Sequence, residues 1–141
     1  MLLLTAIGCA RSSEPQAAEA SRHVRNRFFV REDAAVAKVE PAPHGNLGDS
    51  TAYRYFDDVT DARVIFRKRA LYKGSGIGMH VLEHDEVYYV VSGRGRLRVD
   101  DREVAVGPNT AAFMHEGADV GIWQEGDDEL VVIVAYPPAQ Q

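Results

Sequence analysis

The stretch MHVLEHDEVYYVVSGRG, residues 79–95, decides how the rest of the chain is interpreted. Its first half holds two histidines and three acids between positions 80 and 86, and a tyrosine-rich apolar run and a glycine turn follow at once. Successive side chains of an extended strand point to opposite faces, so Glu86, Tyr88 and Val90 share one face. A carboxylate on an inward face is costly to bury without a polar partner, and the neighbouring histidines are the obvious partners. These polar groups are therefore predicted to line a cavity.

The rest of the chain after residue 25 repeats the same two-residue period. Short alternating or β-branched runs are separated by turn segments rich in glycine, aspartate and asparagine. No segment in this part shows an apolar helical stripe with caps. Many short strands joined by such turns predict an all-β antiparallel sandwich or barrel. The expected strands are residues 35–40, 51–56, 63–72, 87–92, 95–99, 103–106, 110–114, 119–124 and 129–136.

Composition narrows the class of partner. The 141 residues are 45% hydrophobic, which is enough for one ordinary domain with a buried core. The formal net charge of -5 argues against a non-specific nucleic-acid binder, which needs a basic footprint. The basic cluster RKR at residues 67–69 is interpreted as a solvated strand face, with a patch for an anionic ligand as the alternative. A small organic molecule is the expected partner.

The N-terminal segment MLLLTAIGC, residues 1–9, places small residues directly before Cys9, the one cysteine of the chain. It resembles the lipobox of bacterial lipoproteins, although the apolar run is short and lacks a preceding basic residue. The resemblance implies lipid modification of Cys9 and a location in the bacterial cell envelope, on the periplasmic side. Residues 10–25 are predicted to be a flexible tether, and residues 26–141 the barrel domain. A cytoplasmic protein with a disordered tail is the alternative.

The spacing of glycine, histidine and glutamate around the opening stretch resembles a known family motif. Five residues separate Gly74 from His80, Glu86 follows, and six residues separate Glu86 from Gly93. This pattern resembles the first motif of the cupins, with a second motif expected within residues 106–124. The resemblance covers roughly residues 60–136. It implies an antiparallel double-stranded β-helix, or jelly-roll barrel, which often forms a homodimer.

The resemblance also implies a divalent metal, and the chain departs from the usual ligand set. Cupins typically bind Fe, Mn, Ni or Zn through three histidines and a glutamate. His80 and Glu86 match two of these ligands, whereas Leu82 and Val120 occupy the other two positions. Two protein ligands hold a transition metal poorly. A metal bound by His80, His84 and Glu86 stays open as an alternative.

Several further residues are candidates for the cavity wall. His84 lies just before Glu86, and His44 belongs to an N-terminal segment that could fold over the barrel mouth. In the second motif His115 stands in place of a proline and Gln124 in place of an asparagine. Tyr88 shares the face of Glu86 and could hold a ligand through its hydroxyl group. His115, Gln124, Tyr88, Leu82 and Val120 are therefore the predicted binding residues.

Three functions remain open from the sequence. The first is a small-molecule-binding barrel in which a catalytic His80–Glu86 pair transfers protons, as in metal-free cupins that isomerise or epimerise sugars. The second is a metal-dependent oxygenase or lyase with an atypical ligand set. The third is a non-catalytic module that binds a metabolite in the envelope or serves as a dimeric structural unit. Because Leu82 and Val120 occupy two of the four usual ligand positions, the sequence favours metal-free chemistry.

Overall fold

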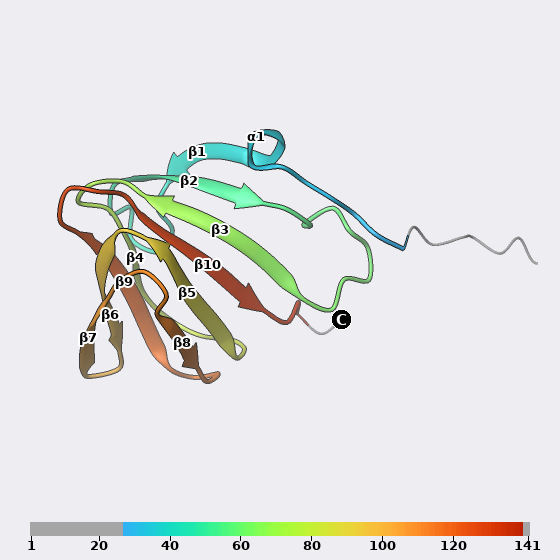
Figure 1. The fold of residues 1–141 in the computed structure, drawn as a ribbon. Helices are drawn as coiled ribbons and strands as arrows, with labels where there is room; N and C mark the ends of the chain where they lie inside the picture. Colours follow the sequence, from blue (N-terminus) through green and yellow to red (C-terminus); the bar gives the residue numbers. More distant parts are fainter. Residues whose placement is uncertain (1–26, 140–141) are drawn as a thin grey trace, which may run out of the picture.

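The computed structural model describes residues 27–139, and these form an antiparallel β-barrel, which confirms the all-β prediction (Figure 1). Cys9 and the tether of residues 10–25 lie outside the described residues. The elements are α1 (Asp33–Val36), β1 (Ala37–Pro41), β2 (Asp49–Arg54), β3 (Ile65–Leu71), β4 (Gly76–Val81), β5 (Glu86–Ser92), β6 (Arg94–Val99), β7 (Arg102–Val106), β8 (Ala111–Met114), β9 (Asp119–Glu125) and β10 (Leu130–Tyr136).

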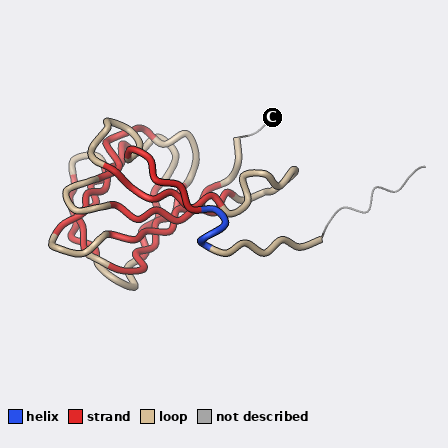
Figure 2. The backbone as a smooth tube through the Cα atoms, turned by 90° about the horizontal axis from the view of Figure 1, so that it is seen from above, coloured by secondary structure: helices blue, strands red, loops and turns tan. Residues whose placement is uncertain are grey.

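The strands form two sheets. The larger sheet has the order β1-β2-β3-β10-β5-β8, and the smaller has the order β4-β9-β6-β7. All neighbouring strands run antiparallel. Figure 1 shows β1 and β2 extending the larger sheet beyond β3. Figure 2 shows α1 beside the strand body, with the coil of residues 27–32 leading away from it.

Strand β5 has the inward and outward alternation expected from its sequence. Glu86, Tyr88 and Val90 are 5%, 2% and 2% exposed, while the residues between them face outward. Gly93 ends the strand with a φ of +77°, in the left-handed region that glycine adopts without strain. A Cβ at this glycine would lie 2.0 Å from the carbonyl oxygen of Glu129, so the tight turn requires glycine.

The interior changes from apolar to polar along the strands of the larger sheet. On β3, the same face carries Leu71, which is fully buried, and then Arg69 and Arg67. On the partner strand, Val132 lies opposite Arg69 and Val134 lies opposite Arg67. One end of the barrel is therefore a packed hydrophobic core, and the other end is left for polar groups.

Two elements differ from the sequence-based expectation. Residues 76–81 form strand β4, which is not among the strands expected from the sequence. The helical turn α1 occupies residues 33–36, where the strand was expected to begin. Within residues 27–139 no helix is long and apolar enough to cross a membrane.

Candidate functional site

The polar end of the barrel contains a cavity of about 440 Å³, a size that suits a small organic molecule. Its apolar wall includes Ile77, Leu82 and Val134. Its polar wall brings together histidines, arginines and the carboxyl group of Glu86. The prediction that the polar residues of the opening stretch line a cavity is therefore confirmed for His80, His84 and Glu86.

Glu86 is the buried carboxyl group of this cavity. Burial raises the pKa of Glu86 above its usual value, and a hydrogen bond with Tyr88 and the charges of His84 and His80 act in the opposite direction. Burial, together with the charge of Glu86, raises the pKa of Tyr88 well above its usual value, so the phenol stays protonated. A carboxyl group of raised pKa next to a neutral hydroxyl donor is suited to exchanging a proton with a bound molecule.

His84 is the imidazole that lies against Glu86. Its Nδ1 is 3.7 Å from Oε2 of Glu86, and this nitrogen is buried with no hydrogen-bond partner among the described residues. The ring stacks on Tyr136, with centroids 4.3 Å apart and planes 4° apart. The stacking fixes the ring, and the carboxyl group lies close enough to bind the nitrogen after a small movement.

His80 faces the same cavity but makes different contacts from those expected. No hydrogen bond joins His80 to Glu86 in the described part of the chain; instead its Nδ1 lies 2.9 Å from the carbonyl oxygen of Gly78. A carbonyl oxygen only accepts, so Nδ1 carries the proton and Nε2 holds the lone pair in the neutral ring. His44 stacks on this ring, with centroids 3.8 Å apart and planes 7° apart.

The loop that carries His44 reaches the cavity because β4 contains Gly78. A Cβ at Gly78 would lie only 1.4 Å from the carbonyl oxygen of His44. Instead the amide of Gly78 donates a hydrogen bond of 3.1 Å to the carbonyl oxygen of Pro43. His44 itself has a φ of 58°, which turns the loop back over the barrel mouth. The expectation that this segment folds over the mouth is therefore confirmed.

The side chains do not fit the metal that the cupin resemblance implies. Leu82 and Val120, at the two altered ligand positions, are 3% and 0% exposed, so aliphatic groups fill that space. His80 and Val120 are direct partners across β4 and β9. Within residues 27–139 no group of three or more His, Cys, Asp or Glu side chains is arranged to hold a metal ion. The set of His80, His84 and Glu86 stays a prediction that this donor geometry does not favour.

Other predicted binding residues lie elsewhere. The His115 side chain is 83% exposed and lies 3.4 Å from Asp85, on the outside of the barrel. Gln124 is buried, and its amide accepts from the backbone of Gly74 and donates to the carbonyls of Gly126 and Asp128. Gln124 therefore holds two turns together. Of the second-motif residues predicted to bind, none contributes to the cavity wall.

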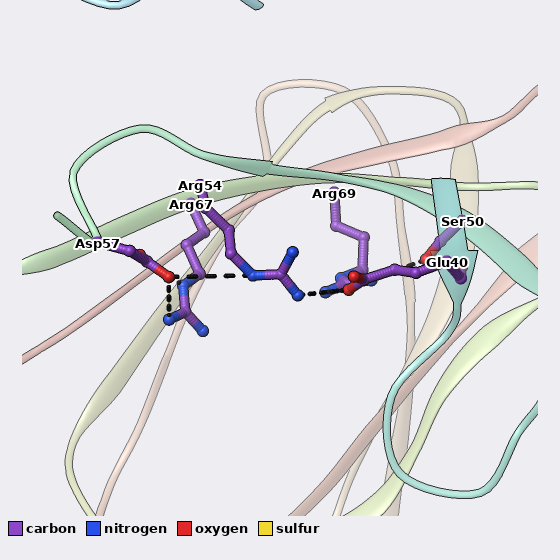
Figure 3. Close-up of polar contacts among 6 residues, drawn as sticks. All are labelled: Glu40, Ser50, Arg54, Asp57, Arg67 and Arg69. Atoms are coloured by element: carbon purple, nitrogen blue, oxygen red, sulfur yellow. Dashed lines mark hydrogen bonds and ion pairs between the residues drawn. The ribbon is translucent and has the colours of Figure 1, made fainter. Parts of the chain in front are cut away.

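The basic cluster of residues 67–69 is interpreted from the sequence as a solvated strand face, with a patch for an anionic ligand as the alternative. Arg67 and Arg69 both line the cavity, with side chains 33% and 12% exposed, so the prediction of a solvated face is wrong for Arg69, while Arg67 is partly exposed. Arg54 of β2 joins them, and Glu40 of β1 lies between Arg54 and Arg69 (Figure 3). The sequence did contain a signal for this: Arg67, Arg69 and Leu71 are alternate residues of one strand, so the two arginines share a face with a residue suited to burial.

Comparison with known proteins agrees with this architecture. Residues 69–136 match the family described as Cupin domain, and the antiparallel barrel agrees with this similarity. No curated protein matches the sequence.

Solved structures of similar fold come from several bacteria. A predicted oxalate decarboxylase from Thermotoga maritima has a TM-score of 0.70 and 18% identity, covering 79% of this chain and 100% of that chain. The protein TT1209 from Thermus thermophilus has a TM-score of 0.62 and 25% identity, covering 79% and 98%. The polyketide cyclase RemF from Streptomyces resistomycificus has a TM-score of 0.66 and 22% identity, covering 78% and 79%. These similarities establish the shared fold.

Proposed function

We propose that the barrel binds a small organic molecule in its cavity and moves a proton to or from a carbon atom of that molecule. The observation that carries the proposal is Glu86, a carboxyl group that is 5% exposed, lies on the cavity wall and has a raised pKa. Structural carboxyl groups are rarely buried in this way without a cationic partner, and perturbed groups in a cavity are typical of functional sites.

The two candidate catalytic groups have complementary roles in the proposal. Glu86 carries a proton more readily than an exposed glutamate, because burial favours its neutral form. In its neutral form the His80 ring holds a lone pair on Nε2, since its Nδ1 donates to the carbonyl of Gly78. One group can remove a proton from a carbon next to a carbonyl while the other returns a proton, either at a neighbouring position or on the opposite face of the same carbon. Such a transfer isomerises or epimerises the ligand without a redox change.

Hydrogen–deuterium exchange tests this proposal without knowledge of the natural substrate. The protein is incubated in deuterated water with a panel of oxo and hydroxy compounds, and exchange at carbon is followed by NMR. Glu86→Gln keeps the size of the side chain and should lower the exchange rate about 10²–10⁴-fold. Glu129→Gln, an exposed carboxyl group in the turn before β10, is the control. If the wild-type protein binds a ligand but catalyses no hydrogen–deuterium exchange at carbon, proton transfer is refuted and the protein is a binding module.

Self-association through the outer face of the larger sheet is part of the proposal. Val87, Tyr89 and Val91 of β5 are 36%, 37% and 43% exposed on this face, and Phe113 of β8 is 59% exposed. Val87 and Phe113 are direct cross-strand partners, so the apolar groups are contiguous. Contiguous exposed apolar surface of this kind is typical of protein interfaces. A homodimer formed by two such faces would cover it.

The envelope location also remains a proposal. It rests on the lipobox-like segment that ends at Cys9, which lies outside the described residues. Incorporation of labelled fatty acid into the full chain, lost in Cys9→Ala, would support the lipid anchor. An unlabelled chain in a host that processes lipoproteins would contradict it.

A further inference from the structure

The cavity wall formed by β2 and β3 concentrates positive charge in a protein whose net charge is -5. Arg54 and Arg67 are direct partners across the two strands, and Arg69 lies two residues further along the same face. Like charges placed directly opposite each other destabilise a sheet. The arrangement therefore needs a reason, and a purely structural wall would be more stable with one of these arginines replaced by an apolar residue.

Two carboxylates of the protein neutralise part of this charge (Figure 3). Asp57 accepts hydrogen bonds of 3.2 and 2.7 Å from Arg67 and lies 3.9 Å from Nε of Arg54. Glu40 accepts hydrogen bonds of 2.5 Å from Arg54 and 3.1 Å from Arg69 through the same oxygen, Oε1. Three guanidinium groups thus face two carboxylates, and one positive charge remains uncompensated within the group.

Arg69 is the most deeply buried member of this group. Its side chain is 12% exposed, and Ser50 accepts a hydrogen bond of 2.7 Å from Nη1. Burial is the largest influence on the pKa of Arg69 and lowers it, although the group remains a cation. A partly desolvated cation attracts an anion more strongly than an exposed one does. The guanidinium of Arg69 also lies near His44, whose pKa is lowered by burial and then by the charges of His80 and Arg69.

We propose that the ligand of this cavity is an organic carboxylate, and that Arg54, Arg67 and Arg69 bind its carboxylate group. The inference rests on the proposed function, because it names the substrate class of the same cavity. The wall already holds one carboxylate, that of Glu40, between two of its arginines, so it has the geometry for such a group. The three arginines carry one more positive charge than Glu40 and Asp57 balance, and this excess favours an anionic group on the ligand.

The arrangement also places the reacting carbon. Arg67 lies close enough to Glu86 for its charge to affect that carboxyl group, so the arginine wall and the proton-carrying group border the same space. A carboxylate held by the arginines directs the rest of a short ligand toward Glu86 and His80. The substrate class is therefore an oxo or hydroxy acid with a carbon-bound proton near its carboxylate.

This inference is tested with pairs of charged and neutral ligands, and with one variant expected to weaken carboxylate binding and another expected to strengthen it. Pyruvate and levulinate are titrated beside their neutral amides and beside inorganic phosphate, with calorimetry and the imidazole NMR signals of the cavity histidines as readouts. Wild type should bind at least one carboxylate about tenfold or more tightly than its amide, because the charge-assisted hydrogen bonds are lost in the amide. Arg67→Gln should weaken carboxylate binding by about tenfold or more for the same reason.

Glu40→Gln distinguishes a binding wall from a merely structural one. Removing this internal carboxylate frees Arg54 and Arg69, so carboxylate binding should become tighter, whereas a structural wall predicts no gain. Arg98→Gln is the control, since Arg98 is exposed on β6 and bonds to the carbonyl of Asp100. Equal affinity for acid and amide, no carboxylate binding, tighter binding of phosphate, or no difference between Arg67→Gln and Arg98→Gln would overturn the inference.

The two proposals fail in different ways. Glu86-dependent exchange that occurs only with neutral compounds would overturn the carboxylate assignment and keep proton transfer. Carboxylate binding that depends on Arg67 but gives no exchange in wild type would keep the carboxylate assignment and overturn proton transfer.

Discussion

Replacing Gly78 by alanine should detach the His44 loop from the barrel. The added Cβ would lie 1.4 Å from the carbonyl oxygen of His44 and 2.7 Å from its carbonyl carbon. Both atoms belong to the backbone, so no side-chain rotation can relieve the overlap. The loop must move away, and the hydrogen bond from Gly78 to Pro43 and the stack of His44 on His80 are lost.

The magnitude follows from those losses. A backbone hydrogen bond contributes about 1 kcal/mol and a stacked ring pair about 0.5–1.5 kcal/mol, so Gly78→Ala should lower the free energy of unfolding by about 1.5–2.5 kcal/mol. The measurement is urea unfolding, with the imidazole NMR signals of His44 and His80 reporting separation of the rings. Both signals should move toward their values in a flexible chain.

Gly107→Ala is the matched control for this change. A Cβ at Gly107 meets no atom within 4 Å, and its backbone is outside the left-handed region. Its free energy of unfolding should change by less than about 1 kcal/mol. If Gly78→Ala is as stable as Gly107→Ala and its histidine signals are unchanged, the loop does not dock through this contact.

Three other outcomes are expected. Burial raises the pKa of Glu86 in the folded protein above its ordinary value of 4.5, so folding favours the protonated form of this side chain. The protonated side chain therefore contributes stability below pH 4.5, and this contribution is lost as the pH rises through the pKa that Glu86 has in the folded protein. In urea unfolding at several pH values, the free energy of unfolding of Glu86→Gln should therefore rise relative to that of wild type as the pH rises above about 4.5. A difference between the two proteins that does not change with pH would contradict the raised pKa of Glu86. The double variant Leu82→His and Val120→His should retain more Zn or Mn through dialysis than wild type, which is the control. Equal metal content in the two proteins would show that Leu82 and Val120 are not the reason why the cavity fits a metal poorly. Tyr89→Lys should shift a dimer to monomer in sedimentation, whereas an unchanged mass would exclude this face as the interface.

Much of the barrel could be predicted from local sequence. The two-residue period of β5 depends only on which side chains alternate, so the inward direction of Glu86 and Tyr88 followed directly. Strand β4 was missed because its glycines have low strand propensity. Tertiary contacts require glycine at both positions: a Cβ at Gly76 would lie 2.5 Å from Trp123, and a Cβ at Gly78 would overlap with the His44 loop. Contacts between segments distant in sequence leave no local periodic signal.

The candidate site was predictable only in part for the same reason. Alternation showed that Arg67 and Arg69 share a face, but the direction of that face depends on the partner strands β2 and β10. The position of Glu40 between two arginines depends on the register of β1 against β2. His80 and Glu86 are predicted from the sequence as a proton-transfer pair; both line the cavity, and the imidazole nitrogen that lies 3.7 Å from Glu86 is that of His84.

The strands β1 and β2 lie before residue 69, where the match to the cupin family begins. They supply Glu40 and Arg54, and the loop between them supplies His44. Under the proposed function, the matched segment carries Glu86 and His80, and the strands before it carry groups that would contact the ligand. Grafting residues 37–54 of one such protein onto another barrel is therefore a route to exchanging ligand preference while leaving the reaction chemistry in place.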